Sequence, residues 1–178
     1  MSDRLQGKRV AILVTDGFEQ VELTSPRDAL QAAGATVDIL SDKSSKVEGW
    51  NHDKPADSFE VTRTFANANL ADYDAIVLPG GVFNGDNIRM DEDAQLLVRQ
   101  AVGADKPIAV ICHGGWILAS VDAVRGKTIT SWPSLKDDLT NAGASWVDKE
   151  VVVDGQLISS RNPDDLPAFN EALVAALG

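Results

Sequence analysis

Short apolar runs alternate with longer amphipathic segments along this chain, and that alternation constrains its fold more than any other feature. The runs are rich in valine and isoleucine, and they lie at 8–16, 36–40, 75–81 and 107–111. Runs of this length and composition are typical of strands buried in a parallel sheet. Strands that alternate with helices predict an α/β domain whose mostly parallel sheet is covered on both faces.

The segments between the runs carry helix signals. The first has helical spacing up to Gly34, and we expect Pro26 to kink or restart that helix. Asp91 is expected to cap a helix within 91–105. Further helices are expected over 115–124, over 134–143, and after Asn162, where Pro163 takes the first helical position.

Two segments depart from the alternation. Residues 151–160 place an Asp-Gly pair between two apolar runs, which predicts a hairpin. Residues 41–65 are the least regular part, and we expect a loop with a small hairpin there. The sequence shows no repeat, low-complexity tract or linker, so a single domain over 1–178 is expected.

Composition limits the partners and the compartment. The formal net charge of −11 disfavours a nucleic-acid surface, which needs clustered lysine and arginine. We find no signal-peptide pattern and no apolar run near the ~18 residues of a membrane helix. A single cysteine cannot form an internal disulfide, which fits a reducing compartment. We therefore expect a cytoplasmic protein without nucleic-acid or membrane partners.

Three chemically interesting pieces directly follow predicted strands. Residues 16–19 follow the first strand, Gly80-Gly81 the third, and Cys112-His113 the fourth. Ligands of open parallel sheets bind outside the carboxyl ends of the strands. We therefore expect these pieces to converge on one crevice.

Cys112 is the only cysteine, and it stands between a predicted strand and a predicted helix. That order is typical of a nucleophile elbow, with Gly114 as the small residue two positions on. Val110 stands where the hydrolase pattern has its first glycine, so the match is partial. The following helix is expected to favour the thiolate. The alternative is an inert thiol, because free cysteine is among the most buried residue types.

Residues around the cysteine suggest further roles. Glu19 would donate a hydrogen bond to the sulfur if protonated, or raise the thiol pKa if ionised. Alternatively, Glu19 and Glu22 are acids on a solvated first helical turn. His113 is not expected to act as a base, because adjacent side chains diverge unless the turn is strained. Its backbone amide and that of Gly81 are better suited to an oxyanion hole.

Other motifs fail. The Gly-Lys-Thr at 126–128 lacks the first glycine of a P-loop, and no G-x-G-x-x-G occurs. His52 and His113 are far apart and offer no metal-ligand spacing with the one cysteine. We therefore expect no metal and no cofactor.

Five segments, in the same order and over nearly the whole chain, resemble the PfpI (ThiJ/PfpI, YhbO-like) family: GFEQVEL, LPGG, AVICHG, SWPSLKDDLTNAGASWVD and VVVDGQLISSRNPDDL. Members of that family are described as intracellular cysteine peptidases, general stress proteins, and glyoxalases or deglycases acting on methylglyoxal and its protein adducts. The resemblance implies a flavodoxin-like three-layer α/β/α sandwich of the class I glutamine amidotransferase-like group.

The resemblance also implies residue roles. Cys112 is the nucleophile, Glu19 the acid that touches its sulfur, and His113 its partner. In PfpI-type proteins an acid from a neighbouring subunit completes the triad, and Asp86 stands at that position. A homo-dimer or larger homo-oligomer is therefore expected. The chain has Gly115 where many members have proline.

The expected chemistry is that of small carbonyls. A thiolate attacks an aldehyde to give a hemithioacetal, Glu19 shuttles a proton, and water releases a 2-hydroxy acid. Gly81, Gly114 and Trp116 are expected around the oxyanion and the substrate. A peptidase must admit an extended chain, so we rank glyoxalase or deglycase activity above proteolysis. The main alternative is a non-catalytic redox-sensing or chaperone stress protein with an oxidisable Cys112.

Overall fold

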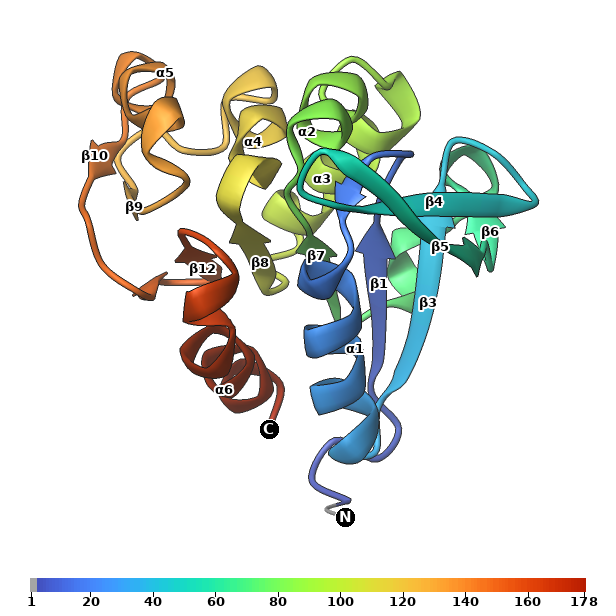
Figure 1. The fold of residues 1–178 in the computed structure, drawn as a ribbon. Helices are drawn as coiled ribbons and strands as arrows, with labels where there is room; N and C mark the ends of the chain where they lie inside the picture. The colour runs from blue at the N-terminus through green and yellow to red at the C-terminus, as the bar shows by residue number, and fades with distance from the viewer. Residues whose placement is uncertain (1–2) are drawn as a thin grey trace.

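A seven-stranded sheet forms the middle of the molecule in this computed structural model, which describes residues 3–178 (Figure 1). Its strand order is β11-β12-β8-β7-β1-β3-β6. Every neighbouring pair is parallel except the β11–β12 hairpin. The strands are β1 (Arg9–Leu13), β3 (Thr36–Ser41), β6 (Arg63–Thr64), β7 (Ala75–Leu78), β8 (Ile108–Ile111), β11 (Val152–Asp154) and β12 (Leu157–Ser160).

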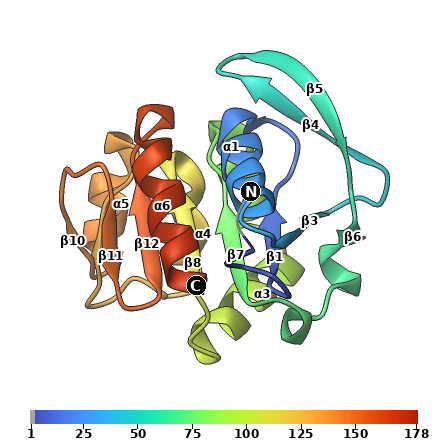
Figure 2. The ribbon, with the colours of Figure 1, turned by 90° about the horizontal axis from the view of Figure 1, so that it is seen from below.

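Helices cover both faces of this sheet. Helices α1 (Val21–Ala32) and α6 (Leu166–Leu177) lie side by side on one face, in front of the strands in Figure 1. Helix α3 (Glu92–Gly103) lies on the other face (Figure 2), where apolar residues of α4 (Trp116–Ser120) and α5 (Lys136–Asn141) share its core. Helix α2 (Val82–Ile88) lies above the carboxyl ends of the strands.

Successive side chains of a strand point to opposite faces of the sheet. Because helices cover both faces, alternate strand residues pack into two separate cores. Val10 and Ile12 of β1 pack with Leu30 and Phe169 from the α1 and α6 side. Ala11 and Leu13 pack with apolar residues of α3, α4 and α5. The expected three-layer α/β/α sandwich with a mostly parallel sheet is confirmed.

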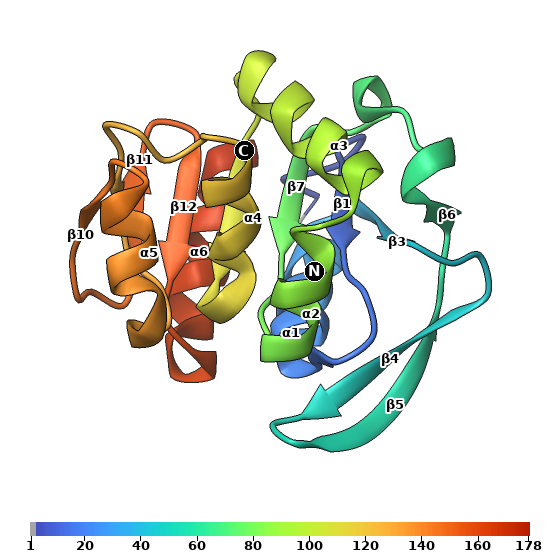
Figure 3. The ribbon, with the colours of Figure 1, turned by 90° about the horizontal axis from the view of Figure 1, so that it is seen from above.

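Two small sheets extend the sandwich. Strands β2 (Phe18–Glu19), β4 (Lys46–Asn51) and β5 (Lys54–Glu60) form one of them, and its long hairpin runs from the β3–β6 side back towards α1 and α2 (Figure 3). Strands β9 (Thr128–Ile129) and β10 (Ser145–Trp146) form the other. The small hairpin expected within 41–65 is present as β4 and β5, but it is longer and more regular than predicted. Nearly every side chain of β5 is exposed, so this strand lacks the apolar alternation that marks strands in a sequence.

The helices match the prediction in place and differ in detail. Helix α1 begins at Val21 and continues through Pro26 to Ala32, so the proline does not restart it. Asp91 caps α3 as expected, accepting a hydrogen bond from the Ala94 amide at 2.9 Å. Helix α4 ends at Ser120, earlier than predicted. Short 3-10 turns lie at Phe65–Asn67 (η1), Leu70–Asp72 (η2), Cys112–Gly115 (η3), Pro133–Leu135 (η4) and Pro163–Asp165 (η5).

The direction in which the sheet grows reverses beside β1. From β1 the chain crosses by α1 to β3 on one side, whereas β7 pairs with the other side of β1. Such a switch point opens a crevice at the carboxyl ends of the two strands. Here the segment after β1 meets the glycines after β7, and the Glu19 amide donates to the Gly80 carbonyl at 3.2 Å.

Across residues 3–178, no helix has the length and apolar character needed to cross a membrane.

Candidate active site

Cys112 sits at a strained turn directly after β8. Its φ of 62° lies in the left-handed region, which side chains other than glycine, asparagine and aspartate seldom adopt. A backbone conformation of this kind costs on the order of 1–3 kcal/mol and occurs preferentially at functional sites. The thiol is only 8% exposed and lies at the floor of a crevice. The predicted order of strand, sharp turn and helix is present.

The crevice is a pocket of about 370 Å³. All three predicted pieces contribute to it, together with the tip of the β4–β5 hairpin, one tryptophan and one proline. Its lining residues are Gly17, Glu19, Glu22, His52, Asp53, Gly81, Val82, Phe83, Cys112, His113, Trp132 and Pro163. The convergence expected from the strand order is therefore found.

His113 contacts the thiol directly. Its ring Nδ1 lies 3.3 Å from Cys112 Sγ, so the expectation that the two side chains diverge was wrong. Adjacent side chains were expected to diverge unless the turn is strained, and the positive φ of Cys112 shows that this turn is strained. The imidazole stacks on Trp132, with ring centroids 5.7 Å apart, and meets the ring of Trp116 edge-on at 5.4 Å. Burial lowers the pKa of His113, which leaves it neutral near pH 7 and able to accept a proton.

The acid nearest the sulfur is Glu22. Its side chain is fully buried, and Oε1 accepts a hydrogen bond from the Gly80 amide at 2.8 Å. Among residues 3–178, Oε2 has no geometrically aligned hydrogen-bond partner, although the carboxyl group interacts with the Cys112 thiol. Burial, helped by the charge of Glu19, raises the pKa of Glu22 to about 8, while the Gly80 amide and the thiol oppose that rise. Near pH 7 the carboxyl is therefore mostly protonated and can donate to the sulfur.

The role expected for Glu19 therefore needs correction, since its neighbour three residues on lies against the thiol. Residues 18–19 form β2, and the helix begins only at Val21, so Glu22 is the acid that turns inward. The sequence contained a signal that Glu22 faces inward, because its helical spacing places it on the buried face of α1 with Pro26 and Leu30. Glu19 lies higher in the same pocket, and its two carboxylate oxygens accept from the His52 amide at 3.2 and 3.1 Å.

The thiol itself does not favour ionisation. Burial is the main cause that raises the pKa of Cys112, a negative charge on Glu22 or Glu19 raises it further, and the amides of His113 and Gly81 lower it. Near pH 7 Glu22 is mostly protonated and adds little of that charge. Burial therefore opposes the preference for thiolate that the sequence predicted. Helix α4 begins four residues after the cysteine and is only five residues long, so its dipole lies too far from the sulfur to compensate burial. The thiol needs a base, and His113 is the nearest one.

Gly81 and Gly114 both allow close approach, in different places. Gly81 has a φ of 88°, and its amide faces the sulfur beside that of His113. A Cβ on Gly114 would lie 2.5 Å from the Leu78 carbonyl oxygen, so this glycine seats the turn on β7 and does not line the pocket.

Trp116 and Asp86 also lie outside the pocket lining. Trp116 supports the His113 ring from behind, and its indole donates to Asp138 at 2.9 Å. Trp132 forms the pocket wall in its place. Asp86 is exposed on α2, and its part in a triad across subunits stays a prediction. Within the described part of the chain, no cluster of three or more His, Cys, Asp or Glu side chains offers a metal site.

Asn84, which the sequence analysis did not single out, joins two walls of the site. It is fully buried, and its Oδ1 accepts from the amide and the hydroxyl of Thr15 at 2.8 and 3.0 Å. Its Nδ2 donates to the carbonyls of Pro79 and Gly80, both at 3.0 Å. The side chain thus ties the segment after β1 to the glycine turn, in which the Gly80 amide holds Glu22 and the Gly81 amide faces the thiol.

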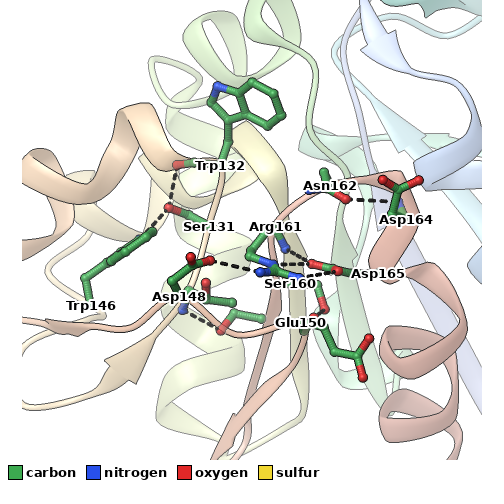
Figure 4. Close-up of polar contacts among 12 residues, drawn as sticks. Ser131, Trp132, Trp146, Asp148, Glu150, Ser160, Arg161, Asn162, Asp164 and Asp165 are labelled. Atoms are coloured by element: carbon green, nitrogen blue, oxygen red, sulfur yellow. Dashed lines mark hydrogen bonds and ion pairs between the residues drawn. The ribbon is translucent and has the colours of Figure 1, made fainter.

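An arginine holds the turn next to the pocket residue Pro163 (Figure 4). Arg161 pairs through Nε and Nη2 with the buried Asp165 and through Nη1 with Asp148, each at 2.9 Å. Asn162 caps the following turn by accepting from the Asp164 amide at 3.0 Å. These contacts fix the turn that carries Pro163 into the pocket.

A second network in Figure 4 holds the segment of Trp132. The Trp146 indole donates to Ser131 Oγ at 2.9 Å, and that hydroxyl donates to the Trp132 carbonyl at 2.8 Å. The Trp132 side chain itself makes no hydrogen bond drawn in the figure and is 40% exposed. Its backbone is therefore fixed, while its ring stays available to stack on His113 at the pocket mouth.

Comparison with known proteins identifies the family to which this chain belongs. The family model for the DJ-1/PfpI family matches residues 8–176. The chain belongs to the DJ-1/PfpI family. Among its relatives, protein/nucleic acid deglycase 2 of Escherichia coli is 40% identical over 173 residues, which cover 96% of this chain and 98% of that protein. A Bacillus subtilis relative named as a candidate cysteine protease is 38% identical over 163 residues, covering 92% and 94%.

The DJ-1/PfpI fold is equally clear from solved structures. Drosophila melanogaster DJ-1β superimposes with a TM-score of 0.87 at 29% identity, over 99% of this chain and 91% of that one. The membership implied by the five sequence segments is confirmed.

Proposed function

We propose that this protein is a cysteine-dependent enzyme that converts small 2-oxoaldehydes such as methylglyoxal, or removes their adducts from proteins. The contact of 3.3 Å between Cys112 Sγ and His113 Nδ1, at the floor of a pocket of about 370 Å³, carries the proposal. The name of the Escherichia coli relative as a deglycase supports the same chemistry.

In the first step, His113 takes the thiol proton and Sγ attacks the aldehyde carbon. The amides of Gly81 and His113 face the sulfur, where they can donate to the aldehyde oxygen as it gains charge. Glu22 gives its proton to that oxygen. The product is a hemithioacetal on Cys112, with His113 now charged and Glu22 ionised.

In the second step, Glu22 takes the hydrogen of the former aldehyde carbon as a proton, and the electron pair forms an enediol while His113 protonates the ketone oxygen. Glu22 then returns its proton to the former ketone carbon, and His113 takes the proton from the hydroxyl on the former aldehyde carbon, which bears the sulfur. A thioester of the 2-hydroxy acid remains. Water hydrolyses it to lactate and the free thiol, and His113 returns its proton to Glu22.

The shape of the pocket favours a small carbonyl over an extended peptide. The tip of the β4–β5 hairpin reaches the pocket through His52 and Asp53, and the His52 amide is bound to Glu19. Trp132 and Pro163 narrow it from the other side. A ligand of a few heavy atoms fits this space, whereas a peptidase must hold several residues of an extended substrate.

The proposal is tested by incubating the protein with methylglyoxal and measuring lactate, for the wild type and for Cys112→Ser. We expect turnover in the wild type and none above background in the variant. Equal lactate from both proteins would overturn the proposal. Rapid oxidation of Cys112 by peroxide together with no turnover would favour a redox-sensing stress protein.

A further inference from the structure

The charges that line the pocket are of one sign. Of the lining residues, Glu19, Glu22 and Asp53 carry carboxyl groups, and none of the twelve lining residues is lysine or arginine. Glu22 is mostly protonated near pH 7, because burial raises its pKa to about 8. The charged groups that face an entering ligand are therefore the carboxylates of Glu19 and Asp53.

The two histidines of the pocket offset this charge little. His113 is buried and neutral near pH 7, because burial lowers its pKa. His52 lies at the rim, with 78% of its side chain exposed and its Nδ1 3.5 Å from Glu19 Oε1. Solvent and salt screen a charge at such an exposed site far more than one inside the pocket.

Glu19 is fixed in place. Its side chain is only 12% exposed, and both carboxylate oxygens accept from the His52 amide. Its backbone is held in β2 by pairing with Trp50 of β4, and its amide donates to the Gly80 carbonyl. The carboxylate cannot swing out to solvent without breaking these contacts, so a ligand that enters the pocket meets its charge.

We infer that the carboxylate of Glu19 selects electrophiles by charge on their way to Cys112, and that the exposed Asp53 adds a smaller contribution because solvent and salt screen it. Neutral carbonyl compounds and those bearing an ammonium or guanidinium group enter, and those bearing a carboxylate or phosphate are repelled. The identification of the electrophile as a carbonyl compound rests on the proposed function. The selection itself belongs to the pocket and is measurable without turnover.

The single cysteine makes the test direct. Three methanethiosulfonates would be used, carrying 2-aminoethyl (cationic), methyl (neutral) and 2-sulfonatoethyl (anionic) groups. His113 takes the thiol proton, the Cys112 sulfur attacks the reagent's sulfenyl sulfur to form a disulfide, and methanesulfinate leaves with the bonding electron pair. Rates are followed by intact mass. The cation-to-anion rate ratio is then compared with that of 2-mercaptoethanol, a neutral thiol.

We expect the ratio for Cys112 to exceed that of the free thiol by about tenfold, and Glu19→Gln to remove most of that excess. The rate with the neutral reagent corrects each variant for any change in thiol reactivity. Asp93→Asn is the matched control, since it changes the net charge equally at an exposed site on α3 outside the pocket. Should Glu19→Gln fail to fold, Asp53→Asn at the exposed hairpin tip is a second variant, and we expect it to lower the ratio by a smaller amount.

A wild-type ratio equal to that of 2-mercaptoethanol would overturn the inference. So would an equal fall of the ratio in Glu19→Gln and Asp93→Asn, because the effect would then come from the overall charge. Failure of the lactate assay with the charge ratio intact would overturn the proposed function alone.

Discussion

At the scale of single residues, the buried acid Glu22 makes stability depend on pH. Its pKa is raised from 4.5 to about 8 in the folded protein, so between these values the folded state holds a proton that the unfolded state has lost. Stability therefore falls as pH rises through this window. We expect unfolding in urea to show a loss of a few kcal/mol between about pH 5 and pH 8 in the wild type, and a clearly smaller loss in Glu22→Gln. Equal losses in the two proteins would contradict a protonated Glu22.

The strained turn at Cys112 gives a second prediction at the same scale. Its φ of 62° suits glycine better than alanine. Cys112→Gly is therefore expected to be more stable than Cys112→Ala by about 1 kcal/mol, even though glycine loses more chain entropy on folding. Urea unfolding of the two variants measures the difference. An alanine variant as stable as the glycine variant would show that the turn holds no strain.

Some residues of the site could be predicted from the sequence, and one important residue could not. The cysteine, the histidine and the glycine after β7 were found from their places after predicted strands. Glu22 was not chosen, because a first-turn acid normally points to solvent. Only the exact start of α1 decides which of two acids three residues apart faces inward, and that start depends on β2, a two-residue strand formed by pairing with β4.

At the scale of elements, Asn84 ties β1 to the glycine turn before α2. Removing its four hydrogen bonds leaves buried partners unsatisfied, so Asn84→Ala is expected to cost about 2–4 kcal/mol of unfolding free energy. It should also lower kcat more than the stability loss explains, because the Gly80-Gly81 turn loses its anchor. Asn87→Ala, at an exposed site on the same helix, is the control and should change little.

The strands whose side chains are most buried were also the easiest to predict from the sequence. Strands with both faces buried gave unmistakable apolar runs, and the Asp-Gly turn marked the β11–β12 hairpin. The β4–β5 hairpin was expected only as a small hairpin within a loop, and its extent was underestimated for two physical reasons. Nearly all of β5 is exposed, and the turn at His52 takes a φ of 59° without a glycine to announce it. The sequence therefore did not predict that the two residues at its tip, His52 and Asp53, line the pocket.

At the scale of the whole molecule, we propose a homo-oligomer. Val82 and Phe83 on α2 are 54% and 57% exposed beside the pocket mouth, and Asp86 lies on the same helix. Light scattering should give a mass of at least twice the 19.0 kDa of one chain, and Phe83→Lys should lower it. Leu96→Lys, at an exposed leucine of α3, is the control. A wild-type mass of one chain would contradict the proposal and with it a triad completed by Asp86 of a second copy.

We propose different tasks for the two pocket acids: Glu22 moves protons at the thiol, and Glu19 sets the charge that a ligand meets. The most direct test compares kcat/KM for methylglyoxal in Glu22→Gln and Glu19→Gln with the wild type. Because methylglyoxal is neutral, we expect Glu19→Gln to stay within a few-fold of the wild type and Glu22→Gln to lose about 100-fold or more. The opposite order, with Glu19→Gln inactive and Glu22→Gln active, would contradict this assignment.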